Sequence, residues 1–423
     1  MLHQYLELPR AVHILCLGMF INRAGTFLIP FLALYLTTRL GYSESFATWT
    51  IGVYGLGSIC AALLGGHLAD HIGRRTVMLG SLLGATVILM IFSALSTKAA
   101  IVAAAFCLSF VADTYRPAAA AMIADLVEPT RRSLAYGLMY VAINLGFSVA
   151  PVIGGFLAER SFTLLFWGDA LTCAIYAAII VLFISETLPA RSTASADATD
   201  NAAPQEAQPS DRVSALDAAR HILRDRPFLV FCGASLLLAV IFMQSVSTLP
   251  LYMKQFGISA RKYGQILAIN GILITVFQLP MAAWLNRFNR AHLMPLASLL
   301  TAAGFGLTLF AVSPWHFAAT VVVWTIGEMM QSPFLQAIVS DMAPMNLRAR
   351  YMGVFTLSYA AAMSTGVPAG GQILVHAGGR YVWIATFVVG LVSALMYWMV
   401  RAAVAPRRAA QLVEVPPADS PSA

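Results

Sequence analysis

Charged residues are scarce in this chain of 423 residues. Asp, Glu, Lys and Arg together make up 11% of the sequence, whereas hydrophobic residues make up 59%. A typical soluble domain is about 25% charged, and the mean hydropathy of this chain is +0.76. A water-soluble fold could not hide so much apolar surface, so the composition excludes a soluble protein and predicts one that is solvated mostly by lipid.

Cysteine is also rare, and the sequence signatures of catalysis are missing. The five cysteines lie alone within apolar stretches and have no paired spacing, which excludes a disulfide framework and a metal site. The eight histidines are scattered, and no nucleophile motif or phosphate-binding loop occurs. We therefore expect neither an enzyme nor an ATP-driven pump, and we expect no cofactor.

What the sequence has in abundance is long hydrophobic runs. A helix that crosses the bilayer core needs about 20 apolar residues, and segments of that length recur along the whole chain. The first is too long for a signal peptide and is followed by no cleavage pattern, so we expect it to remain in the protein. The segments predict an all-α integral membrane protein of twelve transmembrane helices, at residues 11–37, 48–69, 77–97, 99–125, 134–158, 163–185, 227–253, 263–284, 292–312, 316–342, 352–376 and 381–403.

Between the sixth and seventh segments the composition changes abruptly. Residues 186–226 are rich in Ala, Ser, Asp, Pro and Thr, which predicts a linker without fixed structure. Its last part, 213–224, has the pattern of a short amphipathic helix. The linker separates a six-helix bundle at 1–185 from a second one at 227–403. The remaining residues, 404–423, are expected to form a loose cytoplasmic tail.

The distribution of basic residues predicts an orientation. With the N-terminus inside the cell, 17 of the 26 Lys and Arg fall in cytoplasmic segments and seven on the opposite side. Membrane proteins carry this excess on their cytoplasmic side, so both termini and the linker are expected there, in a bacterial inner membrane. Because topology explains the net charge of +7, no nucleic-acid partner is expected. The expected surroundings are membrane lipids, and the expected oligomeric state is a monomer.

The chain repeats itself at a shift of 216 residues. The shift aligns Gly41 with Gly257 and Arg74 with Arg290. It also aligns further residues in loops, at helix ends and within helices, namely Ser43 with Ser259, Asp125 with Asp341, Arg132 with Arg348, Gly137 with Gly353, and Gly154 and Gly155 with Gly370 and Gly371. One offset across such different positions predicts two pseudo-symmetric halves of parallel topology, and such halves place a substrate site at their interface.

The loop after the second predicted helix carries the motif GHLADHIGRR at 66–75. It resembles motif A of the major facilitator superfamily, with His71 at a position where a basic residue is usual. Glycines permit a tight turn, and a carboxylate can meet a helix N-terminus or nearby arginines. In that superfamily the loop holds the two halves together in the outward-facing state. The resemblance implies this gating role for Gly66, Asp70, Gly73, Arg74 and Arg75, with Asp125 as the partner of Arg74. The alternative is a charged turn that only fixes topology.

The fifth predicted helix carries small residues at a spacing that resembles motif C, the antiporter signature of the same superfamily. Ala150 stands where that motif has a glycine before its proline. Small residues let two helices approach closely, so we expect close contact between the fifth and eighth helices, although any helix contact favours small residues. The resemblance implies antiport and assigns the motif to Gly137, Gly146, Pro151, Gly154 and Gly155.

The resemblance to the superfamily covers nearly the whole chain. Within it, the sequence is similar to the twelve-helix drug:proton antiporters of the kind represented by LmrP and MdtH. The stretch WTIGEMMQSP at 324–333 is similar to one in LmrP-like exporters, where a glutamate acts in proton coupling and in binding of cationic drugs. This similarity implies the same role for Glu328, whereas Met139 and Val246 stand where that subgroup carries aspartates.

Five ionisable residues lie deep within predicted helices: Arg23, Asp113, Arg116, Asp169 and Glu328. Each costs about 2.5–3.5 kcal/mol at the bilayer centre, so they must face a polar cavity or pair with one another. Asp113 and Arg116 share a helical face, and Arg23 is expected to reach Asp113. The alternative for these residues is a salt-bridge cluster that only holds the first and fourth helices together. Asp169 lies nearer the outer end of its helix and is interpreted as structural.

Glu328 has no basic residue in its own helix or in the seventh helix. A lone carboxylate in apolar surroundings exchanges protons nearer neutrality than one in water, so Glu328 is the predicted proton carrier. Polar and aromatic neighbours complete the candidate substrate-binding and proton-binding set, although each alone is also a common packing residue. The set comprises Arg23, Asp113, Tyr115, Arg116, Asn144, Gln244, Trp324, Glu328 and Gln331.

Three hypotheses about function remain open at this point. The leading one is proton-coupled efflux of small lipophilic or cationic compounds by alternating access, driven by the proton motive force. The second is specific uptake or export of an anionic or zwitterionic metabolite, whose carboxylate Arg23 and Arg116 would hold. The third, a membrane enzyme or a receptor without transport, has no motif in its favour.

Overall fold

The computed structural model describes residues 7–128, 131–187, 215–344 and 347–413, and its elements there are helices. The first half contains α2 (Arg10–Ala24), α3 (Leu28–Leu34) with a π-helical extension (Tyr35–Arg39), α4 (Glu44–Ile72), α5 (Arg74–Phe92), α6 (Lys98–Asp113), α7 (Tyr115–Leu126), α8 (Arg132–Arg160) and α9 (Thr163–Phe183). The second half contains α10 (Ala215–Arg224), α11 (Arg226–Met243), α12 (Thr248–Gln255), α13 (Ala260–Leu285), α14 (Arg290–Leu307) with a 3-10 turn (Thr308–Phe310), α15 (Pro314–Met342), α16 (Arg348–His376) and α17 (Gly379–Val413).

The two halves repeat each other at the offset seen in the sequence. α8 and α16 are both 29 residues long, and their first residues are 216 positions apart. The same offset separates the first residues of five further pairs, namely α2 and α11, α4 and α13, α5 and α14, α6 and α15, and α9 and α17. The predicted internal repeat is therefore confirmed in the secondary structure.

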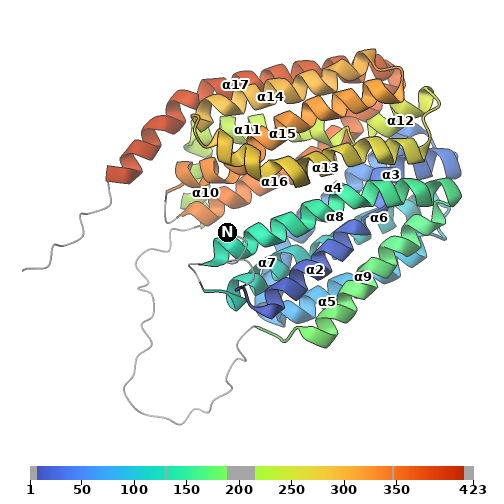
Figure 1. Cartoon of the computed structure of the whole chain (residues 1–423), viewed down its shortest axis with the longest axis horizontal. Coiled ribbons are helices and arrows are strands. Elements are labelled where there is room, and N and C mark those ends of the chain that lie inside the picture. The colour runs from blue at the N-terminus through green and yellow to red at the C-terminus, as the bar shows by residue number, and fades with distance from the viewer. Residues whose placement is uncertain (1–6, 129–130, 188–214, 345–346, 414–423) are drawn as a thin grey trace, which may run out of the picture.

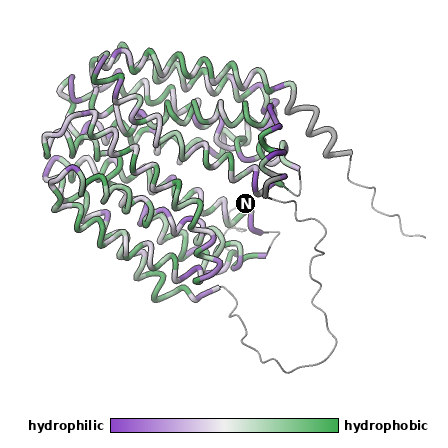
Figure 2. The backbone as a smooth tube through the Cα atoms, turned by 180° about the vertical axis from the view of Figure 1, so that it is seen from behind, coloured by the Kyte–Doolittle hydropathy of each residue, from purple (hydrophilic) through white to green (hydrophobic). Residues whose placement is uncertain are grey.

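Within the described ranges, ten helical segments are long and apolar enough to cross a membrane. α15 and α16 are each 29 residues long but are not among the ten, because polar side chains interrupt their apolar sequence. Large hydrophobic side chains such as Leu182 and Trp315 are exposed, and lipid would cover them. Figure 2 shows hydrophobic residues along the helices of both halves. The structure is thus an all-α, multi-pass membrane protein, while the count of twelve spanning helices stays a prediction.

The halves meet along two pairs of antiparallel helices, and the first pair is α8 with α13. A Cβ atom on Gly155 would lie 3.0 Å from backbone atoms of Ala260 and Arg261, and one on Gly264 would overlap the carbonyl oxygen of Pro151. Glycine lets backbones approach closely in membrane helices, where packing rather than the hydrophobic effect drives association. The close contact predicted between the fifth and eighth helices is therefore confirmed.

The second pair, α4 with α16, makes the pseudo-symmetric contact. Gly52 packs against the ring of Pro368, and Gln372 donates a hydrogen bond from Nε2 to the Oγ of Ser45 at 2.7 Å. Figure 1 shows the two halves converging at the end that carries α3 and α12 and diverging towards the end that carries α10. Contact between the halves is therefore concentrated at one end of the molecule.

The segments outside the two bundles agree with the predictions only in part. Helix α10 confirms the short amphipathic helix predicted at the end of the linker, whereas linker residues 188–214 lie outside the described residues. Helix α17 continues to Val413, so the expectation of a loose tail from residue 404 was wrong for its first part. That part is rich in alanine and arginine, which favour helix, and the rest of the tail, 414–423, lies outside the described residues.

Replacing Gly264 by Val should weaken the packing of α13 against α8, because the new side chain would overlap the carbonyl oxygen of Pro151. Overpacking of this kind costs about 1–3 kcal/mol, so the thermal unfolding midpoint of the purified protein in detergent should fall. Gly80→Val is the matched control, since no atom lies within 4 Å of a Cβ built there. Equal unfolding midpoints for the two variants would contradict the tight contact.

Candidate functional site

Glu328 lies half-buried in the middle of α15. Its Oε2 accepts a hydrogen bond from Nδ2 of Asn270 on α13 at 2.7 Å, and the same amide lies 3.1 Å from Oγ1 of Thr325. No lysine or arginine in the described part of the chain lies within ion-pairing distance of this carboxylate. In the described part of the chain, Glu328 is therefore a carboxylate without a basic partner, as the sequence predicts.

Glu328 faces the seam between the two halves. Tyr140 on α8 and Tyr359 on α16 are both close enough to Glu328 to interact with it electrostatically. Tyr140 belongs to the first half, is 46% exposed, and also lies beside Ser332, one turn further along α15. A carboxylate on the second half is therefore bordered by a partly exposed side chain of the first half, as a site between the halves requires.

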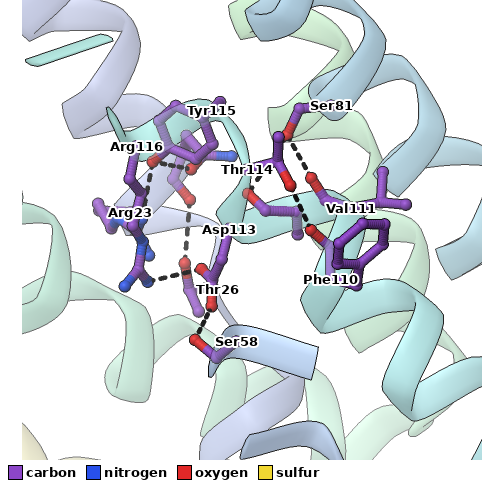
Figure 3. A network of polar contacts seen from close by, with 12 residues as sticks. Arg23, Thr26, Ser58, Ser81, Phe110, Val111, Asp113, Thr114, Tyr115 and Arg116 are labelled. Atoms are coloured by element: carbon purple, nitrogen blue, oxygen red, sulfur yellow. Dashed lines mark hydrogen bonds and ion pairs between the residues drawn. The ribbon is translucent and has the colours of Figure 1, made fainter. Parts of the chain in front are cut away.

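A separate polar cluster lies inside the first half and is built around Arg23 (Figure 3). Arg23 is 6% exposed, and its Nη2 donates a hydrogen bond to the hydroxyl of Tyr115 at 2.7 Å. That hydroxyl in turn donates to Oδ1 of Asn22 at 3.1 Å. The guanidinium also lies over the ring of Phe147, 5.5 Å from its centroid. Aromatic faces and a hydroxyl thus surround the buried cation.

Asp113 does not form the direct ion pair with Arg23 that the sequence led us to expect. It pairs instead with Arg116, Nη2 to Oδ1 at 3.0 Å, and accepts a hydrogen bond from the hydroxyl of Ser58 at 2.5 Å (Figure 3). The helix is interrupted at Thr114, which separates α6 from α7. Asp113 thus pairs with Arg116 on its own helical face and not with Arg23 on another helix.

Asp169 on α9 lies at the break between α2 and α3. Its Oδ2 accepts a hydrogen bond from the backbone N–H of Leu28, the first residue of α3, at 3.5 Å. Arg23 occupies the last turn of α2 on the other side of the break. A carboxylate at a helix N-terminus and a cation at a C-terminus both match the helix dipole.

The other predicted binding residues divide into two groups. Gln244 donates to the carbonyl oxygens of Val240 and Gly366, and Trp324 is 1% exposed among aromatic rings, so both pack inside the second half. Asn144 lies nearer the seam, whereas Gln331 is 4% exposed on α15. Asn144 is one turn from Tyr140 and donates to its carbonyl oxygen at 2.8 Å. Within the described residues, no hydrogen bond joins the side chain of Gln244 or Trp324 to the carboxylate of Glu328.

The motif A loop forms an ordered junction at the end of the first half opposite the converging contacts. Arg74 forms the expected ion pair with Asp125 and also donates from Nη1 to the carbonyl oxygen of Ala121 at 3.0 Å. Gly73 adopts φ 110°, which favours glycine, and Gly66 has open space around it. Within the described ranges, Asp70 is exposed and has no hydrogen bond or ion pair.

The residue that closes this junction is not among those predicted from the sequence. Glu186, just after α9, accepts backbone hydrogen bonds from Arg74 and Arg75 at 3.0 Å each. Arg75 donates from Nη2 to the carbonyl oxygen of Val181 at 3.0 Å, and the Thr187 hydroxyl donates to Asp125 at 3.0 Å. Only the acidic side chain of Glu186 at the start of the linker could have signalled this contact. The start of the linker is therefore fixed to the motif A loop.

The motif C residues of α8 contact two different neighbours. Gly146 and Gly154 face the first helical segment, where added Cβ atoms would meet Arg23 and Phe31 respectively. Gly155 and the carbonyl oxygen of Pro151 face α13 across the seam, while Gly137 lies nearer the start of α8. The motif therefore packs α8 against both its own half and the opposite half.

The sequence and the fold both match known membrane transporters. The model of the Major Facilitator Superfamily matches residues 15–276 and 245–420. A Na(+), Li(+), K(+)/H(+) antiporter of Planococcus maritimus is 26% identical over 369 residues, which are 80% of this chain and 84% of that protein. Multidrug resistance protein MdtH of Blochmanniella floridana is 19% identical over 383 residues, 87% of this chain and 89% of that one.

Among solved structures, a POT family transporter in complex with 5-aminolevulinic acid superimposes with a TM-score of 0.77. The match covers 94% of this chain and 97% of the other, at 18% sequence identity. At that identity the likeness concerns the fold alone.

Asp125→Asn should destabilise the protein, because Arg74 would keep only its hydrogen bond to a backbone carbonyl. The loss of one partly buried charged hydrogen bond is worth about 1–2 kcal/mol, measured as a lower thermal unfolding midpoint in detergent. The repeat supplies the control, Asp341→Asn, whose partner Arg290 is 3.8 Å away. An equally large effect at Asp341 would contradict a special role for the motif A pair.

Proposed function

This chain belongs to the Major Facilitator Superfamily, and we propose that it is a proton-coupled antiporter that exports small lipophilic or cationic compounds. Membership makes it a secondary transporter of a small molecule and not an enzyme. The single observation that carries the proposal is the position of Glu328, a carboxylate without a basic partner in the described chain that faces the seam between the halves. The relatives named as an antiporter and as a multidrug resistance protein support antiport and export.

The proposed cycle is a rocking of residues 1–185 against residues 227–403. Ser259 and Arg261 at the start of α13 both contact Glu159 at the end of α8, at 2.7 Å and 4.0 Å. Together with Gln372 and Ser45, these contacts close one end of the seam. The excess of basic residues at the opposite end assigns that end to the cytoplasm. The arrangement is then the inward-facing one, in a bacterial inner membrane with both termini cytoplasmic.

In this cycle the carboxylate of Glu328 binds a proton and a cationic substrate in turn. With the site open to the outside, the carboxylate takes up a proton, which removes its charge and releases a cationic substrate. With the site open to the cytoplasm, the proton leaves, and the charged carboxylate attracts the next cation. Tyr140 and Tyr359 border the carboxylate and offer aromatic faces that suit a lipophilic cation.

The motif A loop supplies the proposed cytoplasmic gate. Arg74, Asp125 and Glu186 keep the loop rigid in the inward-facing arrangement, while Asp70 is exposed and free of partners in the described chain. When the halves close at the cytoplasmic end, Asp70 becomes available to the helix ends and arginines of the second half. This would stabilise the outward-facing state without any energy source beyond the proton motive force.

A second candidate function is transport of an anionic or zwitterionic metabolite. The observation that favours it is the Arg116 guanidinium, whose side chain is 51% exposed although it pairs with Asp113. A substrate carboxylate could replace Asp113 as its partner, with Arg23 close behind. This hypothesis requires Arg116 to contact the substrate, whereas the leading proposal does not.

Glu328→Gln should abolish proton-driven export, because the amide keeps the size of the side chain and the hydrogen bond from Asn270 but cannot bind a proton near neutral pH. In reconstituted vesicles, export of the fluorescent cation ethidium driven by an imposed pH gradient should fall to the level of protein-free vesicles. Asp217→Asn on the exposed helix α10 is the control and should transport normally. Export by Glu328→Gln at the wild-type rate would refute the coupling role.

Arg116→Gln distinguishes the two candidate functions. Under the leading proposal, ethidium export should persist within about twofold of wild type, because the group lost is an exposed cation outside the Glu328 site. Under the second candidate, uptake of one labelled carboxylate from a panel of amino and organic acids should be lost. Arg131→Gln, another half-exposed arginine of the first half, serves as the control for a general effect of charge.

A further inference from the structure

The first half contains a small, partly open cavity that the proposed cycle does not use. Its volume is about 40 Å³, and its lining residues come from α2, α3, α4, α5, α6, α7 and α9 and the break between α2 and α3, all in the first half. Its polar lining consists of Asn22, Arg23, Thr26, Tyr54, Asp113, Tyr115, Asp169 and Cys173. Two carboxylates and one guanidinium around a space of this size are unusual within a membrane-spanning bundle.

An unsatisfied donor belongs to this cavity. Arg23 is 6% exposed, and its Nε–H has no hydrogen-bond partner in the described chain. A buried charged donor without a partner is costly, and a cavity of about 40 Å³ exceeds the roughly 10–15 Å³ that one water molecule needs. Water there would accept from Arg23 and donate to the carboxylates of Asp113 and Asp169, which gives it the two to four polar partners that buried water has.

The cavity also connects to an exposed side chain. Asp113 lines the cavity and is paired at 3.0 Å with Arg116, whose side chain is 51% exposed. Asp169 lines the same cavity and is 9% exposed. A hydrogen-bonded path from Asp113 through cavity water would reach Asp169.

We propose that this cavity is a second proton-binding site, in which water delivers a proton to the carboxylate of Asp169. The transfer forms an O–H bond on Asp169 and breaks one on a hydronium ion, which is left as water, and no electron changes hands. The charged and titratable groups that line the cavity together with Asp169 are Arg23 from α2, Tyr54 from α4, Asp113 from α6, Tyr115 from α7, and Cys173 from α9 itself.

This inference rests on the proposed proton-coupled export, and it makes one addition to it. With Glu328 as one proton carrier and Asp169 as another, two protons would enter for each substrate molecule exported. Asp169 also caps α3, and Phe31 of α3 packs against Tyr263 of the second half with ring centroids 5.4 Å apart. Protonation of Asp169 would weaken the cap and so affect the contacts that close the outer end.

The test is the proton-to-substrate ratio in reconstituted vesicles, with ethidium as the probe and the membrane potential held at zero. At a pH difference of one unit, two protons per cation sustain a gradient of about 100-fold, and one proton sustains about 10-fold. We expect the wild-type protein to reach the larger gradient and Asp169→Asn the smaller one. Asn is itself a good helix cap, so this variant removes the proton and keeps the hydrogen bond to Leu28.

A second variant tests the cavity without touching a charge. Ala112→Val places two methyl groups in the cavity lining, which should displace the water and lower the gradient to about 10-fold. Ala103→Val, on the exposed face of the same helix, is the control and should keep the wild-type gradient. Equal gradients for wild type, Asp169→Asn and Ala112→Val would overturn the second site while proton-coupled export stands. Absence of any pH-driven gradient in the wild type would overturn the proposed function itself.

Discussion

The cost of holding charge inside an apolar helical bundle is the constraint on which the rest of this structure depends. An ionised side chain far from water must find hydrogen bonds, an opposite charge or a solvated cavity. The protein uses the first two. Arg23 finds a hydroxyl and two aromatic rings, Asp113 finds Arg116 on its own helical face, and Glu328 finds an amide at the seam.

Helix breaks make these solutions possible. The first transmembrane segment is interrupted between Ala24 and Leu28, and the fourth at Thr114. Each break exposes backbone groups within the bundle, and each lies beside a charged side chain that matches the local helix dipole or the freed hydrogen-bonding groups. In membranes, such irregular backbone is tolerated only inside protein or along a water-filled cavity. The breaks and the buried charges therefore depend on each other.

The internal repeat does not extend to the buried charged residues. The starts of six helix pairs follow the offset of 216 residues, and the glycine contacts of α8 with α13 and of α4 with α16 follow the same symmetry. The buried charges do not. The positions that correspond to Arg23 and Arg116 are Ala239 and Ser332, and the position that corresponds to Glu328 is Ala112. Common packing thus builds the two-fold scaffold, and the differences between the halves give each half its own polar site.

The sequence by itself determined the membrane class, the two halves and the pairing of Arg74 with Asp125, because hydrophobic length, a constant offset and a local motif are all read along one chain. Only the tertiary structure decided that Arg23 meets Tyr115, that Asp169 shares a cavity with Asp113, and that Gln244 and Trp324 are buried within the second half. The physical reason is that the sequence does not fix how each helix is rotated about its own axis. Packing across the bundle sets the face that each helix turns towards its neighbours and the places where a helix breaks. The hydropathy of the sequence determines neither of them.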